Sequence, residues 1–104
     1  MTIQMYVSEV LQVPVTIVGY NLIVEAIEIT LDTKDFRFYT ILSEATGRPR
    51  RYLEKAIRTA KDKSLTYMDE STRRILHSSK VTLTNTEYIL AATKLYREEY
   101  EDKE

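Results

Sequence analysis

The sequence predicts an all-α protein, a compact bundle of about six helices that contains a helix-turn-helix. Glycine occurs only at positions 19 and 47, and proline only at positions 14 and 49, so few residues interrupt a helix. Apolar residues recur at three- and four-residue spacing in most segments, which is typical of amphipathic helices. A chain of 104 residues has room for one hydrophobic core, so we expect a single domain over residues 1–104.

The composition excludes several classes of protein. The chain has no cysteine, and therefore no disulfide, thiolate metal site or cysteine nucleophile. No apolar run reaches the roughly 18 residues of a membrane helix, and the first ten residues lack a basic leader. His77 has no second histidine for a metal site, and two glycines are too few for a phosphate-binding loop. We expect a cytoplasmic protein that is not an enzyme and has no cofactor, metal or membrane partner.

The first two helices are expected at residues 3–12 and 21–31. Apolar residues of the first, from Ile3 to Leu11, lie at helical spacing, and Pro14 ends it. The β-branched stretch "VPVTIVGY" is short and has no hairpin partner, so it is read as a connector. Asn21 is the expected N-cap of the second helix.

The next two helices form the predicted helix-turn-helix at about residues 34–62. Asp32 or Thr33 is expected to cap the helix "KDFRFYTILSEAT". Gly47 ends this helix as a left-handed residue, and Pro49 suits the first turn of the following one. A tight turn at Gly47 therefore joins the two helices.

The remaining helices complete the bundle. A fifth helix is expected at residues 69–77, followed by the polar loop 78–83. Thr84 and Glu87 have the T-x-x-E spacing of a capping box and mark the start of the last helix. Its apolar stripe includes Tyr88, Leu95 and Tyr96, and these three residues are the expected contact of a homodimer.

The segment "GRPRRYLEKAIRTAKDK", residues 47–63, has seven basic residues and two acidic ones, although the net charge of the whole chain is −1. At 100° per residue, one side of this helix is apolar and packs on a core. The opposite side carries Arg51, Lys55 and Arg58, which suit guanine edges and phosphates. The candidate DNA-binding residues are Arg48, Arg50, Arg51, Glu54, Lys55, Arg58, Thr59 and Lys61. This pattern leaves two interpretations open, a DNA-binding face and an ordinary solvated face.

Three stretches carry a resemblance to a known family: "SEVLQVPVTIVGYNLIVEAI" (8–27), "YLEKAIRTA" (52–60) and "LTNTEYILAATKLYRE" (83–98). In this order and spacing they resemble the C-terminal effector domain of the sporulation master response regulator, stage zero sporulation protein A. The matching positions are Val13, Pro14, Gly19, Tyr20, Leu22, Ala26 and Ile27 in the first stretch and Glu54, Ala56, Ile57 and Arg58 in the second. The third stretch is close to the family pattern P-T-N-S-E-F-I at Leu83, Thr84, Asn85, Thr86, Glu87, Tyr88 and Ile89.

The resemblance implies a helical transcription factor that binds double-stranded DNA through its helix-turn-helix. It also implies that Glu54, Lys55, Arg58 and Thr59 face the bases, with Arg50 and Arg51 near the helix start. Tyr52 and Lys55 replace arginines of the family, so the target sequence does not carry over. The receiver domain of such regulators is missing from this sequence, so the resemblance is to the effector domain alone.

A second function class stays open beside DNA binding. A protein-interaction module would use the acidic residues of the N-terminal part and the tail to bind a regulator or RNA polymerase, and would keep the helix-turn-helix as a scaffold. The two hypotheses predict different environments for Arg51, Lys55 and Arg58. A DNA reader needs these side chains exposed and unpaired, whereas an interaction module can hold them in ion pairs.

Overall fold

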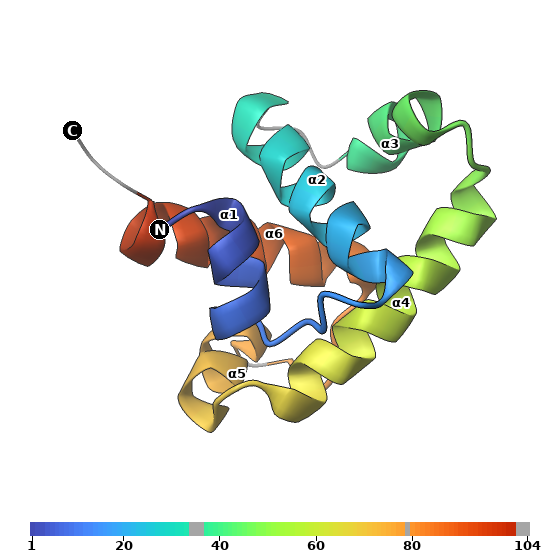
Figure 1. Ribbon diagram of the computed structural model, residues 1–104. Helices are drawn as coiled ribbons and strands as arrows, with labels where there is room; N and C mark the ends of the chain where they lie inside the picture. The colour runs from blue at the N-terminus through green and yellow to red at the C-terminus, as the bar shows by residue number, and fades with distance from the viewer. Residues whose placement is uncertain (34–36, 79, 102–104) are drawn as a thin grey trace.

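A computed structural model describes residues 1–33, 37–78 and 80–101 (Figure 1). These residues form six α-helices and two π-helical segments and contain no strand, so the predicted all-α fold is confirmed. The elements are α1 (Ile3–Met5), η1 (Tyr6–Val10), α2 (Val18–Thr33), α3 (Phe38–Thr46), α4 (Arg50–Tyr67), α5 (Glu70–His77), α6 (Asn85–Leu95) and η2 (Tyr96–Tyr100).

The first predicted helix is confirmed, whereas the predicted cap of the second is wrong. α1 continues directly into η1, and the segment ends near Gln12, whose φ is 58°. α2 begins at Val18, three residues before Asn21, so Asn21 lies inside the helix. The reason is that Ile17 already accepts a hydrogen bond from the Tyr20 amide, at 3.1 Å. The chain therefore coils before it reaches the expected cap.

The predicted caps of the third helix are also wrong. Asp32 and Thr33 form the last turn of α2, where the Thr33 hydroxyl donates to the Ile29 carbonyl at 2.8 Å. α3 begins at Phe38, after Arg37 at the N-cap position. The predicted start of this helix, residues 34–36, lies outside the described residues.

The turn between α3 and α4 is the one that the sequence predicts. Gly47 has a φ of 71°, and its amide donates to the Ser43 carbonyl at 2.9 Å. A left-handed residue is most easily glycine, because it has no Cβ. Pro49 occupies the N-cap position of α4 and accepts the Tyr52 amide at 3.0 Å. α3, the turn and α4 therefore have the order of a helix-turn-helix.

The last two helices begin as the sequence predicts. α5 starts after Asp69, at the N-cap position. At the start of α6, Thr84 Oγ1 accepts the Glu87 amide at 3.1 Å, and Glu87 Oε1 accepts the Thr84 amide at 3.0 Å. This reciprocal pair is the predicted capping box. Lys80 also forms an ion pair with Glu87, so the loop before α6 is tied to its first turn.

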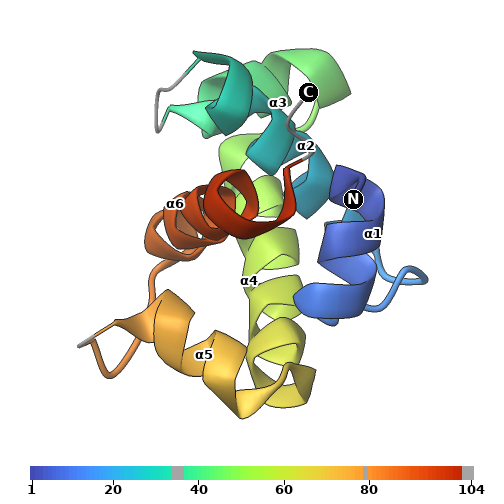
Figure 2. The ribbon, with the colours of Figure 1, turned by 90° about the vertical axis from the view of Figure 1, so that its left-hand side faces the viewer.

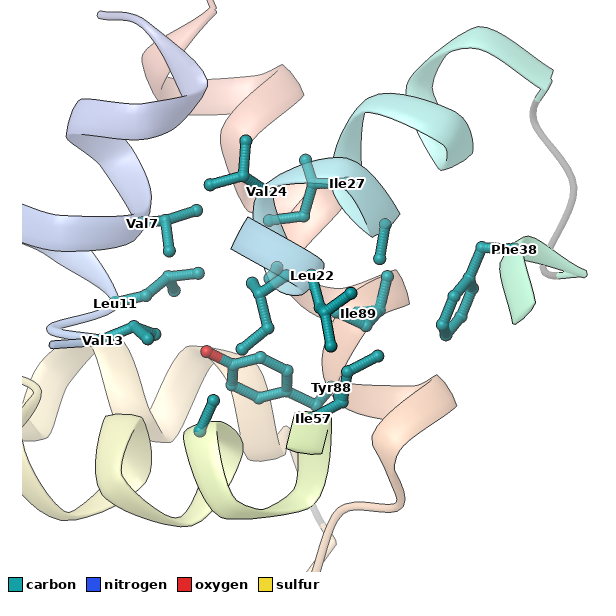
Figure 3. Close-up of a cluster of buried hydrophobic side chains, with 14 of the residues drawn as sticks. Val7, Leu11, Val13, Leu22, Val24, Ile27, Phe38, Ile57, Tyr88 and Ile89 are labelled. Atoms are coloured by element: carbon teal, nitrogen blue, oxygen red, sulfur yellow. The ribbon is translucent and has the colours of Figure 1, made fainter. Parts of the chain in front are cut away.

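The core lies where α2 packs against α3, α4 and α6 (Figure 3). Its fully buried side chains include Val7, Leu11, Ile23, Ile27, Phe38, Leu42, Leu53, Ile57 and Ile89. Tyr88 also lies here, and its hydroxyl is 2.6 Å from Ser64 Oγ. Ser64 Oγ in turn donates to the Leu11 carbonyl at 2.5 Å. The buried hydroxyl groups are thus paired, as burial requires.

Candidate nucleic-acid interface

α4 runs along one side of the molecule, and the N-terminus and η2 lie on the opposite side (Figure 1). Viewed from the side of the N-terminus and η2, α4 lies behind α1 and α6 (Figure 2). Its inner face is held by Leu53, Ile57 and Ala60, each 0% exposed. This is the apolar face that the sequence predicts, and it fixes which side of α4 faces away from the core.

Gly19 of α2 lets α2 and α4 approach each other unusually closely. A Cβ added at Gly19 would lie 2.5 Å from the Ala56 carbonyl oxygen and 2.5 Å from the Ala60 Cβ. Real Cβ atoms do not approach other atoms so closely, so only glycine fits here. This contact anchors α4 rigidly on α2, and the orientation of its outer face follows from it.

Three predicted DNA-binding residues lie together on the outer face of α4. Arg51, Lys55 and Arg58 are all exposed. None of the ion pairs or side-chain hydrogen bonds found in residues 1–33, 37–78 and 80–101 engages their charged groups. Their positive charge is therefore uncompensated and open to an anion. We call these three residues the basic face.

Arg50 and Glu54 lie beside the basic face and pair with each other. Arg50 Nε is 2.8 Å from Glu54 Oε1, and the two side chains remain 67% and 37% exposed. The Arg50 guanidinium also lies 4.8 Å from the centre of the Tyr39 ring. Burial raises the pKa of Tyr39 above its ordinary value.

Arg48 lies in the turn before α4, next to Tyr52. Its guanidinium is 4.9 Å from the centre of the Tyr52 ring, a cation–π arrangement. Tyr52 itself is 37% exposed at the rim of the helix. Tyr52 therefore lies at the surface, beside Arg48.

Lys61, a predicted DNA-binding residue, does not lie on the exposed face of α4. Lys61 is only 9% exposed, and its Nζ donates to the Leu83 carbonyl at 2.7 Å. The segment that leads into α6 covers this edge of α4 and takes up the ammonium group. The helical angle of Lys61 is close to that of the polar face, but no sequence pattern shows that residues 80–84 cover it.

Thr59 is exposed on α4 as expected, but its hydroxyl is already engaged. Oγ1 donates to the Lys55 carbonyl one turn earlier, at 3.1 Å. The part of Thr59 left for a partner is chiefly its methyl group.

The predicted dimer residues are part of the core. Tyr88, Leu95 and Tyr96 are 0%, 7% and 6% exposed, and they pack within the single chain. The Tyr96 hydroxyl donates to the Met1 carbonyl at 2.6 Å, and Met1 belongs to the same chain. The stripe predicted as a dimer contact is therefore the inner face of the last helix, and these three residues are covered within one chain.

Asn85 is a residue of this region that the sequence analysis did not select. Its Nδ2 donates to the Glu54 carbonyl at 2.9 Å and to the Tyr39 hydroxyl at 3.0 Å. It thereby ties the start of α6 to α4. The only sequence signal was its place in the resembling stretch 83–98, which does not reveal a contact with residue 54.

Other kinds of site find little support in the described part of the chain. It contains no cluster of three or more histidine and acidic side chains suited to a metal. His77 lies at the end of α5, with Nδ1 3.2 Å from the Lys80 carbonyl oxygen. None of the described helices is long and apolar enough to cross a membrane.

Comparisons with protein-family models, with curated proteins and with solved structures found no match. The assignment of a function therefore depends on the geometry of α4 and on the sequence motifs quoted above.

Proposed function

We propose that this protein is a sequence-specific double-stranded DNA-binding protein, a transcriptional regulator that inserts α4 into the major groove. The observation that supports this most is the basic face, because Arg51, Lys55 and Arg58 are exposed and free of acidic partners within the described residues. Arginine offers two parallel donors to guanine O6 and N7, and lysine binds phosphate or guanine as a point charge.

The dimensions of α4 suit this role. Its 18 residues span roughly 27 Å at 1.5 Å per residue. The major groove, about 12 Å wide, admits a single α-helix. The basic face occupies the N-terminal half of α4, next to the turn from α3. In helix-turn-helix proteins this end of the second helix contacts base edges.

The Arg50–Glu54 ion pair is compatible with DNA binding. Both side chains are more than one third exposed, and such surface pairs contribute only about 0–1 kcal/mol. A phosphate group near Arg50 can replace the carboxylate without a large loss. Glu54 is then free to accept from a cytosine amino group, the usual partner of a carboxylate in the major groove.

The resemblance to the sporulation effector domain supports the same function. We propose that the chain acts as such an effector domain, by binding and not by catalysis. We further propose that it acts in the cytoplasm and that RNA polymerase is a second partner. The DNA sequence that this protein recognises is not the family's target, because Tyr52 and Lys55 differ from the family pattern.

One observation favours the alternative, a protein-interaction module. Exposed carboxylates gather on α2 and η2: Glu25, Glu28 and Asp32 on α2, and Glu98 and Glu99 on η2. A basic partner protein would be attracted to these groups. In that case α4 stays a scaffold, and the basic face has no partner to explain its three unpaired cations.

Selection from a random duplex library distinguishes the two functions. We expect a single enriched motif that contains guanine, because arginine pairs best with guanine. The matched control is the variant with Arg51→Ala, Lys55→Ala and Arg58→Ala, which should enrich nothing. If the wild-type protein enriches no motif at low salt and high protein concentration, the DNA-binding function is wrong.

A further inference from the structure

A hollow of about 400 Å³ lies beside the basic face, between α4 and the start of α2. Its lining is largely apolar and consists of Ile17, Val18, Gly19, Tyr52, Lys55, Ala56 and Thr59. Val18 is 61% exposed and Tyr52 37%, more than is usual for side chains of this size. The hollow and the basic face share Lys55, so they form one continuous surface.

Two cations lie at the border of this apolar hollow. Lys55 stands at one border, and the Arg48 guanidinium lies against Tyr52 at 4.9 Å. Among the described residues, no acidic side chain lines the hollow. The cations beside the hollow attract the phosphates of a DNA backbone. An apolar group of DNA therefore fits this surface better than an apolar side chain of a protein does.

The position of the hollow relative to the basic face suggests which group of DNA it meets. Around the axis of α4, the directions of Tyr52 and Thr59 differ from the direction of Arg51 by about 80–100°. When the basic face points at the centre of the major-groove floor, these two residues face the side of the floor that borders the backbone of one strand. Thymine is the base that presents an apolar group, its C5-methyl, on the major-groove side.

We infer that this hollow receives the 5-methyl group of a thymine at the edge of the bound site. The Thr59 methyl group and the Tyr52 ring contact the methyl, and Lys55 and Arg48 neutralise the neighbouring phosphates. The inference rests on the proposed function and adds a specificity that the charged residues do not supply. Thr59 takes part through its methyl group because its hydroxyl is bonded to the Lys55 carbonyl.

Replacement of thymine by deoxyuridine tests this directly, because it removes one methyl group and leaves the base pair unchanged. Each thymine of the selected duplex is replaced in turn, and the dissociation constant is measured by fluorescence anisotropy. We expect one position per site to weaken binding by about fourfold, the effect of exposing a single methyl group. The other positions should change the affinity by less than about twofold.

The variant Thr59→Ser assigns the effect to the hollow, since it removes the methyl group and keeps the hydroxyl. We expect it to bind the thymine duplex about fourfold more weakly and to lose sensitivity to deoxyuridine. Thr66→Ser is the matched control, because Thr66 lies on the same helix and donates to the Asp62 carbonyl at 2.8 Å. It should keep the wild-type response.

Failure of this inference differs from failure of the proposed function. If the protein binds its motif but no deoxyuridine substitution weakens binding, or the motif has no thymine, the hollow does not read a methyl group. The same holds if Thr59→Ser responds to deoxyuridine as the wild type does. If no motif is enriched at all, the proposed function fails first.

Discussion

Arg58 lies within the basic face, and its guanidinium forms no ion pair within the described residues. We predict that Arg58→Ala costs about 1–3 kcal/mol of specific DNA affinity, because a bidentate contact to guanine is lost. The measurement is titration of the selected duplex by fluorescence anisotropy. Arg74→Ala is the control, since Arg74 is an exposed arginine on α5 that pairs with Glu70. An equal loss in both variants would contradict the prediction.

Lys61 has a structural role, which distinguishes it from Lys55 on the same helix. Its Nζ donates to the Leu83 carbonyl at 2.7 Å in a buried position. We predict that Lys61→Met lowers the free energy of unfolding by about 1–3 kcal/mol, because this carbonyl loses its partner. Lys55→Met should leave the stability within about 0.5 kcal/mol and weaken DNA binding instead. Urea denaturation and DNA titration of both variants check this; the reverse outcome would assign the roles the other way round.

At the scale of the helices, the structure shows which signals are readable from sequence. Gly47 and the capping box were predicted correctly, because each acts within four residues of its own position. The Asn21 cap was wrong because a turn that begins at Ile17 starts α2 early. A propensity for a cap does not reveal which of several turns the tertiary fold selects.

The same distinction holds for the candidate site. The two faces of α4 follow from a 100° rotation per residue, so the basic face and its apolar opposite were predictable. The burial of Lys61 and the contact of Asn85 with Glu54 were not, since both depend on a segment more than 20 residues away. The burial of Tyr88, Leu95 and Tyr96 within one chain was missed for a related reason: an apolar stripe shows that a face is buried, but not what covers it.

The contact between α2 and α4 gives an element-scale prediction. Gly19→Ala places a Cβ 2.5 Å from the backbone oxygen of Ala56, which cannot move without distortion of α4. We predict a loss of about 1–3 kcal/mol in the free energy of unfolding, the usual cost of overpacking. The same substitution in a solvent-exposed helix would raise the free energy of unfolding, so the direction of the change tests the close contact. Thermal unfolding followed by circular dichroism measures it, and a raised melting temperature would refute the close approach.

The stability of the whole molecule should fall at alkaline pH. Burial raises the pKa of both Tyr6 and Tyr88 well above the value of about 10 of an unfolded chain. Above pH 10 the unfolded state therefore releases protons that the folded state keeps. The free energy of unfolding then falls by up to about 1.4 kcal/mol per pH unit for each tyrosine. Urea denaturation between pH 8 and 11 tests this, and Tyr88→Phe should reduce the slope; constant stability would contradict it.

The separation of charge across the molecule determines how salt should act on DNA binding. The net charge is −1, yet the basic face lies on α4 and the exposed Glu98 and Glu99 lie on η2, at the opposite side (Figure 1). Affinity for any duplex should therefore fall steeply with salt, because each phosphate contact releases counterions. We predict that Arg48→Ala weakens binding to all sequences alike and reduces the slope of log K against log salt by about 1. Arg97→Ala, on η2, should leave the slope unchanged. Titrations at several salt concentrations measure both slopes, and an equal change in the two variants would show that net charge, and not the position of a cation beside α4, attracts the DNA.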